Sequence, residues 1–205
     1  ISCLGKAVDN NPQLHGYKNI RNRLVMFRDV DLFLPIEFDD AEYPFPAVHI
    51  LRAINRLGAD EIESEIQQVK ADGIDSQQFR KKWRHLSRFY LLPGFIRRRL
   101  LEILFQFPTF MRKYLGTVAV TAVGMFGAGQ GHGLGLSNHA LEVIIGGIGK
   151  KTVTVKNRPE VREMISITIS VDHDTIDGAP GARFARDFRH YVESGIGLAI
   201  SADMQ

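Results

Sequence analysis

The sequence predicts a mixed α/β fold, because strands dominate its second half and helices separate them. Residues 165–171 alternate isoleucine or valine with serine or threonine, and a period of two is typical of a half-buried strand. Residues 117–123 form another run rich in β-branched side chains. Residues 60–70 carry apolar side chains at helical spacing, and a last helix is expected at 180–192.

Shorter signals predict the other elements. The N-terminus has the pattern of a helix ending near Asn10. We expect Pro35 to lie at a sheet edge or a strand end. Strands are expected at 23–27, 30–36, 141–145 and 153–155, an apolar run at 48–54, loops at 39–46 and along the glycine-rich 124–135, and helices at 76–92 and 95–107. We expect one domain over residues 1–205, with a basic helical insert at about 79–114.

Charge is unevenly distributed along the 205 residues. The net charge is +3, yet residues 80–113 contain ten Lys or Arg and one acid, so the remainder is negative. Apolar side chains interleave with these arginines, but no run reaches the ~18 residues that span a bilayer. The insert could form a helical hairpin packed on a neighbouring subunit, lie on an anionic membrane surface, or bind phosphates of coenzyme A. Nucleic acid is the least favoured partner.

One cysteine, Cys3, excludes an intrachain disulfide and favours a reducing compartment. The first twenty residues show no apolar stretch of the kind found in signal peptides. We therefore expect a cytoplasmic protein, with membrane association as an alternative through the insert.

The segment SVDHDTIDGAPGARF, residues 170–184, places a histidine at the end of the alternating strand. If the alternation continues, His173 points toward the buried side with the isoleucines, and Asp177 follows across a turn. A histidine held this way can act as a general base, because a general base needs a pKa near neutral pH and a fixed tautomer. The alternative is a capped turn, with Asp177 as the helix N-cap, Pro180 in the first turn and His173 in the core. The pattern alone favours the capped turn.

A set of ordered motifs resembles a known family. His-x-x-x-Asp-Gly is followed by Ala-x-x-Ala-Arg-Phe, and Thr121-Ala122-Val123-Gly124-Met125-Phe126-Gly127 resembles Ser/Thr-Asn-x-Gly-x-Phe-Gly. Residues 27–31 and 140–184 follow in the matching order. The chain resembles the catalytic domain of the acyltransferase component of 2-oxo acid dehydrogenase complexes, which shares the fold of chloramphenicol acetyltransferase. The resemblance covers most of 1–75 and 115–195, and implies that the chain begins inside a helix of the family domain.

The resemblance implies a coenzyme A-dependent acyltransferase that acts on a dihydrolipoyl-like thiol or another small acceptor. His173 would be the base, Thr121 the oxyanion donor, Asp177 an orienting or structural residue, and Gly178 the residue that permits a tight turn. Gly178 and Asn138 are the candidate coenzyme A contacts. The active site would lie between subunits of a homotrimer. Any lipoyl group would come from a partner, and no metal is expected.

Three departures from the family pattern support a second hypothesis. Asp174 replaces an expected cation, Ala122 replaces an asparagine, and Ser137–Ala140 replaces an Asn-Pro-Pro-Gln turn. The alternative is a catalytically inactive assembly or membrane-docking protein that keeps the fold. His132 and His139 are expected to be surface loop residues, with His139 as a minor candidate for lining the acyl site.

Overall fold

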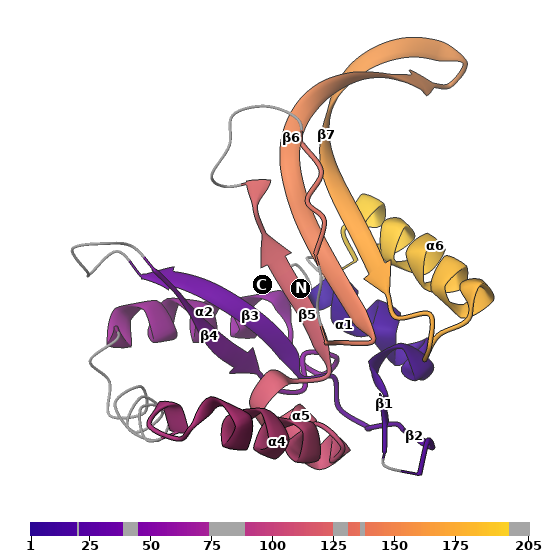
Figure 1. Ribbon diagram of the computed structural model, residues 1–205. Coiled ribbons are helices and arrows are strands. Elements are labelled where there is room, and N and C mark those ends of the chain that lie inside the picture. The colour runs from indigo at the N-terminus through magenta and orange to yellow at the C-terminus, as the bar shows by residue number, and fades with distance from the viewer. Residues whose placement is uncertain (20, 39–44, 74–88, 125–130, 136–137, 197–205) are drawn as a thin grey trace.

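The computed structural model describes residues 1–19, 21–38, 45–73, 89–124, 131–135 and 138–196 (Figure 1). Its helices are α1 (Ser2–Asp9), the short 3-10 helix η1 (Pro12–His15), α2 (Ala59–Asp72), α4 (Gly94–Leu104), α5 (Pro108–Leu115) and α6 (Gly178–Ser194). Its strands are β1 (Tyr17–Lys18), β2 (Leu24–Val25), β3 (Leu32–Phe38), β4 (Phe45–Leu51), β5 (Val118–Ala122), β6 (Leu141–Val155) and β7 (Arg158–Val171).

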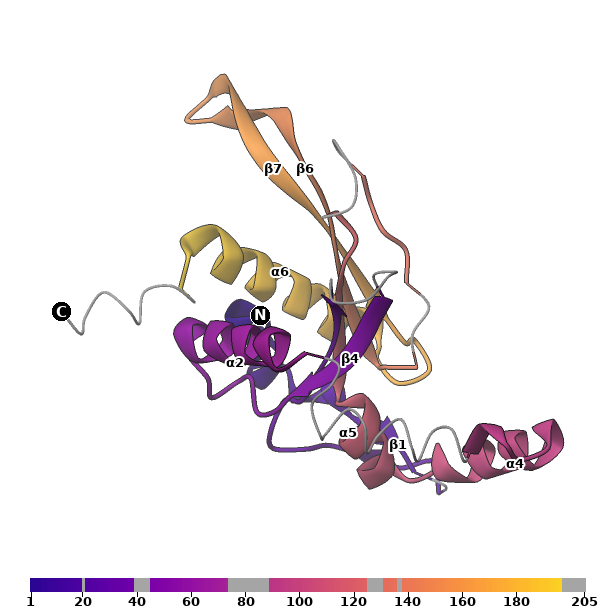
Figure 2. The same cartoon turned by 90° about the vertical axis from the view of Figure 1, so that its left-hand side faces the viewer.

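The main sheet has the strand order β4-β3-β5-β6-β7 and mixes parallel with antiparallel pairs. β3, β5 and β6 run parallel to one another, whereas β4 and β7 pair antiparallel at the two edges. Helices α1, α2 and α6 lie on one side of this sheet (Figure 2). The hairpin of β6 and β7 extends well beyond the other strands (Figure 1).

Alternation along the strands assigns one face of the sheet to the hydrophobic core. Val120 of β5 and Val143 of β6 are buried on the face that meets the helices. Phe184 and Phe188 of α6 complete that core and stack with their ring centroids 5.6 Å apart. The other face carries Thr121, Glu142, Ile144, Thr168 and Ser170, because paired residues of neighbouring strands share a face.

An extended segment, residues 131–135, lies against that second face and has glycine at positions 131, 133 and 135. We call it the glycine segment. A Cβ added at Gly146 has no room, because the Gly131 carbonyl oxygen lies 2.2 Å from that position, whereas a Cβ added at Gly131 would meet nothing within 4 Å. A Cβ at Gly133 would lie 2.4 Å from Cγ2 of Ile144. A Cβ at Gly135 would lie 2.3 Å from the carboxylate of Glu142. Stacking this segment on the sheet therefore requires glycine at positions 133 and 135.

The structure confirms most of the predicted elements. The N-terminal helix, the helix at 60–70, the strand at 117–123, the alternating strand and the last helix are all present. Pro35 lies where β3 pairs with β4 only, because β5 pairs no further than Phe33, so its local-edge position is confirmed. The strand expected at 30–36 is observed as β3, which begins at Leu32. The apolar run at 48–54 belongs partly to β4. Most of the helix expected at 76–92 lies outside the described residues.

Two predicted strand boundaries are wrong. Residues 141–145 and 153–155 belong to a single strand, β6, because the Gly146–Gly147 pair causes an irregularity between Ile145 and Ile148 without ending the strand. The strand expected at 23–27 is the short β2, which pairs with β1 outside the main sheet.

The described part of the basic insert, residues 89–114, contains two helices that differ in burial. Pro108 and Met111 of α5 are buried, and Arg112 is bound to acidic residues of the body. α4 has no buried residue, and Figure 2 shows it projecting away from the sheet. Within the described part of the chain, no helix is long and apolar enough to cross a membrane.

Candidate active site

The turn between β7 and α6 is organised by Asp172. Its backbone N–H donates to the Ala140 carbonyl at 2.9 Å, which ties the turn to the start of β6. Its side chain accepts from the Asp174 N–H and from the Thr175 hydroxyl, both at 3.0 Å. An aspartate that bonds two residues ahead is typical of an Asx turn, so Asp-x-Asp-Thr was the signal that could have identified Asp172.

His173 lies at the outer side of this turn and is exposed. The expectation that it points to the buried side is wrong, because β7 ends at Val171 and the Asp172 turn breaks the alternation. Its two flanks are nevertheless fixed. Val171 packs on the core and Ile176 is 1% exposed, so a solvent-facing imidazole stands on a rigid support.

Asp177 occupies the N-cap position of α6, as predicted, but its side chain makes no capping hydrogen bond. Both Asp177 and His173 lie in described residues, and no hydrogen bond or ion pair joins them in the structure. Gly178 is exposed, its added Cβ would meet nothing within 4 Å, and its φ is not positive. The predicted need for glycine in a tight turn is therefore wrong at Gly178.

Thr121 is half-buried on β5 and faces the glycine segment. Its strand partner is Ile144, whose partner on β7 is Thr168, five residues before His173. Two strand spacings of ~4.8 Å and five residues at ~3.3 Å separate Thr121 from His173 by roughly 15–20 Å within one chain. One chain alone does not bring these two predicted site residues together.

Glu142 lies between those two positions and was not identified from the sequence. It pairs with Ala119 of β5 and Ser170 of β7, on the same face as Thr121. Burial raises the pKa of its carboxyl group. Its Oε2 atom is shielded from solvent without a hydrogen-bond partner, so this face of a single chain holds an incompletely satisfied acid.

The loop before β6 contains Asn138, which is exposed, and His139, which is 8% exposed. The prediction that His139 is a surface residue is wrong. Its Nε2 donates to the Leu115 carbonyl at 2.7 Å, and its ring lies 5.3 Å from that of Phe33. Burial lowers the pKa of His139, which makes it a neutral packing residue. His132 is exposed, as predicted.

A separate charged cluster joins α5 to the sheet. Asp31 is 1% exposed and accepts from Arg112 Nε and Arg52 Nη1, both at 2.8 Å, and from the Ala53 N–H at 3.0 Å. Burial alone would raise the pKa of Asp31, but these three donors outweigh it and the pKa is lowered. Arg112 also pairs with Asp29 at 3.4 Å. The paired charges line a hollow of about 430 Å³, and its position away from Thr121 and His173 indicates a structural role.

No group of three or more His, Cys, Asp or Glu side chains is arranged to hold a metal ion within the described residues. The side chains of the candidate site offer a hydroxyl, an imidazole and carboxyl groups.

Comparison with known proteins gives the same answer as the motifs. Residues 113–200 match the model of the 2-oxoacid dehydrogenases acyltransferase catalytic domain, and this stretch includes Thr121, His173 and Asp177. Residues 113–200 of this chain are therefore similar to that catalytic domain. The acetyltransferase component of the pyruvate dehydrogenase complex of Rhizobium meliloti is 33% identical over 86 residues, which are 42% of this chain and 19% of that protein. The chain thus spans about a fifth of that curated relative.

Solved structures of the acyltransferase family show the same fold. A probable dihydrolipoamide acetyltransferase from Listeria monocytogenes superposes with a TM-score of 0.63 at 19% identity, covering 94% of this chain and 69% of that one. The dihydrolipoamide acetyltransferase of Azotobacter vinelandii gives 0.61 at 14% identity, with 93% and 66% covered. The latter was studied for the catalytic roles of a serine, a histidine 52 residues later and an asparagine four residues after that. The predicted mixed α/β fold with flanking helices is confirmed.

Proposed function

We propose that the protein is a coenzyme A-dependent acyltransferase that moves an acyl group between coenzyme A and a dihydrolipoyl-like thiol. The carrying observation is spacing within the matched segment. Thr121, His173 and Asp177 stand 52 and four residues apart, which are the separations of the serine, histidine and asparagine in the Azotobacter enzyme. Threonine keeps the hydroxyl of that serine, and aspartate keeps an oxygen where that asparagine has one.

The proposed chemistry needs one base and one hydrogen-bond donor. The neutral imidazole of His173 takes the proton from the attacking thiol, and the thiolate attacks the thioester carbonyl. The Thr121 hydroxyl donates to the oxyanion of the tetrahedral intermediate. When that intermediate collapses, the C–S bond to the original thiol breaks, and the departing thiolate takes the proton back from the imidazolium. The reaction is thus reversible and consumes no net proton.

The same proposal requires more than one chain at each active site. Thr121 and His173 are roughly 15–20 Å apart by strand geometry, far beyond the reach of a shared substrate atom. In a homotrimer, His173 of one subunit would meet Thr121 of the next. The exposure of His173 in a single chain fits a surface that a second subunit covers. That residues 1–205 form one domain with an insert at about 79–114 remains a prediction.

The acceptor and the coenzyme A contacts are part of the proposal. A lipoyl group would arrive on a partner, and the candidate contacts are Asn138, at the exposed loop before β6, and Gly178, at the start of α6. Asp174 places an acid beside His173, and its carbonyl accepts from the Lys18 ammonium. We expect this charge to alter acceptor preference, because the family pattern places a cation there.

The test follows thiol release when purified protein is mixed with acyl-CoA and dihydrolipoamide. Because a general base contributes typically 10²–10⁴-fold, His173→Ala should reduce the rate by about that factor. His190→Ala is the matched control, since His190 is an exposed histidine on α6 outside the site. Activity unchanged by His173→Ala would exclude the assigned base.

A second candidate function is an assembly protein that keeps the fold without the chemistry. The missing contact between His173 and Asp177, together with Ala122 and Asp174, favours it. Calorimetry with acyl-CoA separates the two functions. The acyltransferase should bind acyl-CoA with an affinity that is retained in His173→Ala, whereas an inactive assembly protein should give no heat of binding.

A further inference from the structure

Helix α4 is the one helix of the described residues without a buried side chain. It has 11 residues and none is buried. Ile96, Leu100 and Ile103 lie on one side of the helix at exposures of 40, 37 and 43%. An isolated helix shorter than about 12–15 residues is marginal in water, so α4 needs a surface that covers this side. Phe95 adds a ring that is 76% exposed beside Arg98 and Arg99.

The arginines of α4 form ion pairs within the helix and remain exposed to solvent. Arg98 Nε and Arg99 Nη1 both contact Glu102 at 3.2 Å, which leaves two arginines sharing one acid. Their side chains are 85 and 75% exposed. Arg97 adds a third cation, which lies over the Tyr90 ring at 5.3 Å. α4 therefore presents an apolar strip flanked by net positive charge.

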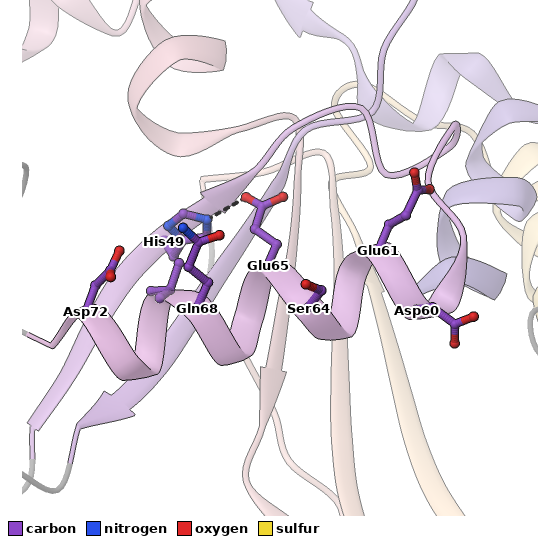
Figure 3. Close-up of a pocket in the computed structure, with 8 residues that line it drawn as sticks. His49, Asp60, Glu61, Ser64, Glu65, Gln68 and Asp72 are labelled. Carbon is purple, nitrogen blue, oxygen red and sulfur yellow. Dashed lines mark hydrogen bonds and ion pairs between the residues drawn. The ribbon is translucent and has the colours of Figure 1, made fainter.

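A groove of opposite charge lies on the far side of the molecule, along α2 and β4. It has a volume of about 740 Å³. Figure 3 shows His49 of β4 and the side chains of α2 around it. The acids among its lining residues are Asp60, Glu61, Glu65 and Asp72, and Val69 supplies an apolar patch. Helix α2 contains five acidic residues and one basic residue, Lys70, so its net charge is −4.

We infer that α4 of one copy of this chain docks in the α2 groove of a second copy. The chain carries both halves of the complementary pair, and α2 and α4 lie apart in both views of a single molecule (Figures 1 and 2). Rim charges of this kind select the partner and its register, while the apolar strip of α4 against Val69 provides burial.

Such a contact joins two different surfaces and is therefore head-to-tail. A head-to-tail contact closes into a ring when the rotation between copies permits it, and a threefold ring is one such solution. The inference does not depend on acyl transfer, because neither α4 nor the α2 groove contains Thr121, His173 or Asp177.

Charge reversal on each side tests the contact in the full chain. Arg98→Glu with Arg99→Glu should weaken self-association at least about tenfold in sedimentation velocity. So should Glu65→Lys with Gln68→Lys and Asp72→Lys. Mixing the two variants should restore association, because α4 is then negative and α2 positive. The control is Arg186→Glu with Arg189→Glu, two exposed arginines of α6 that also pair with neighbouring acids. Unchanged association in both sets, or no recovery on mixing, would overturn the inference.

Cross-linking identifies the contact even if another interface also holds the copies together. In a Cys3→Ser background, a chain with Arg98→Cys is mixed with one carrying Asp72→Cys and treated with a short bismaleimide. A linked pair that needs both substitutions is expected, and replacing Asp72→Cys by Glu163→Cys on β7 should abolish it. The competing occupant is an anionic membrane. The inference fails if phosphatidylglycerol vesicles bind the protein through Arg98 and Arg99 while the cross-link is absent.

Discussion

The turn after β7 and helix α4 are both exposed, but they are exposed for different reasons. The turn stands between Val171 and Ile176, and the following helix anchors itself through the fully buried Phe184. α4 presents its apolar residues to solvent and buries none of them. An exposed polar group on a rigid support is typical of a reactive site, whereas exposed apolar side chains on an uncovered helix indicate a surface for association.

Substitution of two phenylalanines, one in each region, should give the largest difference in stability. Phe184→Ala should lower the free energy of unfolding by about 3–5 kcal/mol, because it empties a fully buried position. Phe95→Ala on α4 should change it by less than about 0.5 kcal/mol, because that ring is mostly in water. Urea denaturation of both variants at one protein concentration measures the difference. Equal effects would mean that α4 is as well packed as the body.

The stability of the packed body of the protein should also decrease in acid, because His15 is buried there. Burial lowers the pKa of His15 to about 4, and its Nδ1 has no hydrogen-bond partner. The unfolded chain takes up a proton near pH 6.5, so this stability is present above pH 6.5 and is lost as pH falls toward 4. The loss should reach about 3 kcal/mol. Urea midpoints between pH 7 and 4 should show it.

The control for acid sensitivity is His15→Leu, whose stability should depend less on pH over that range, whatever its value at pH 7. An undiminished slope in His15→Leu would assign the acid sensitivity to other groups.

The glycine segment gives a smaller effect. Gly133→Ala places a methyl group against Ile144 and should cost about 1–3 kcal/mol through overpacking. Gly178→Ala is the matched control, since nothing lies within 4 Å of its added Cβ. It should be neutral or stabilise by up to about 1 kcal/mol. Thermal denaturation distinguishes the two, and a neutral Gly133→Ala would show that the segment does not rest on the sheet.

Periodicity predicted the fold well where one face of an element is buried. The isoleucines of β7 and the apolar positions of α2 and α6 identified those elements, since burial imposes a period on the sequence. Periodicity failed at His173, because it assumes that the strand continues, and the Asp172 side chain ends it instead. It also failed at Gly146–Gly147, where pairing with β7 carries the strand through an irregularity.

The candidate site was only partly accessible from the sequence. Motif spacing predicts Thr121, His173 and Asp177 as site residues, yet spacing carries no information on whether one chain or two would supply them. Glu142 was missed because a single acid in an apolar run has no local signature. The burial of His139 was missed as well, since it depends on Phe33 and Leu115, which are distant in sequence.

Complementation between inactive chains tests the central claim most directly. His173→Ala and Thr121→Ala chains are each assayed alone, then co-expressed with different tags, purified as mixed assemblies and assayed for acyl transfer. If each site takes His173 from one chain and Thr121 from its neighbour, random mixing in a trimer should restore about one quarter of the sites. Mixed assemblies as inactive as the parent variants would contradict the shared active site.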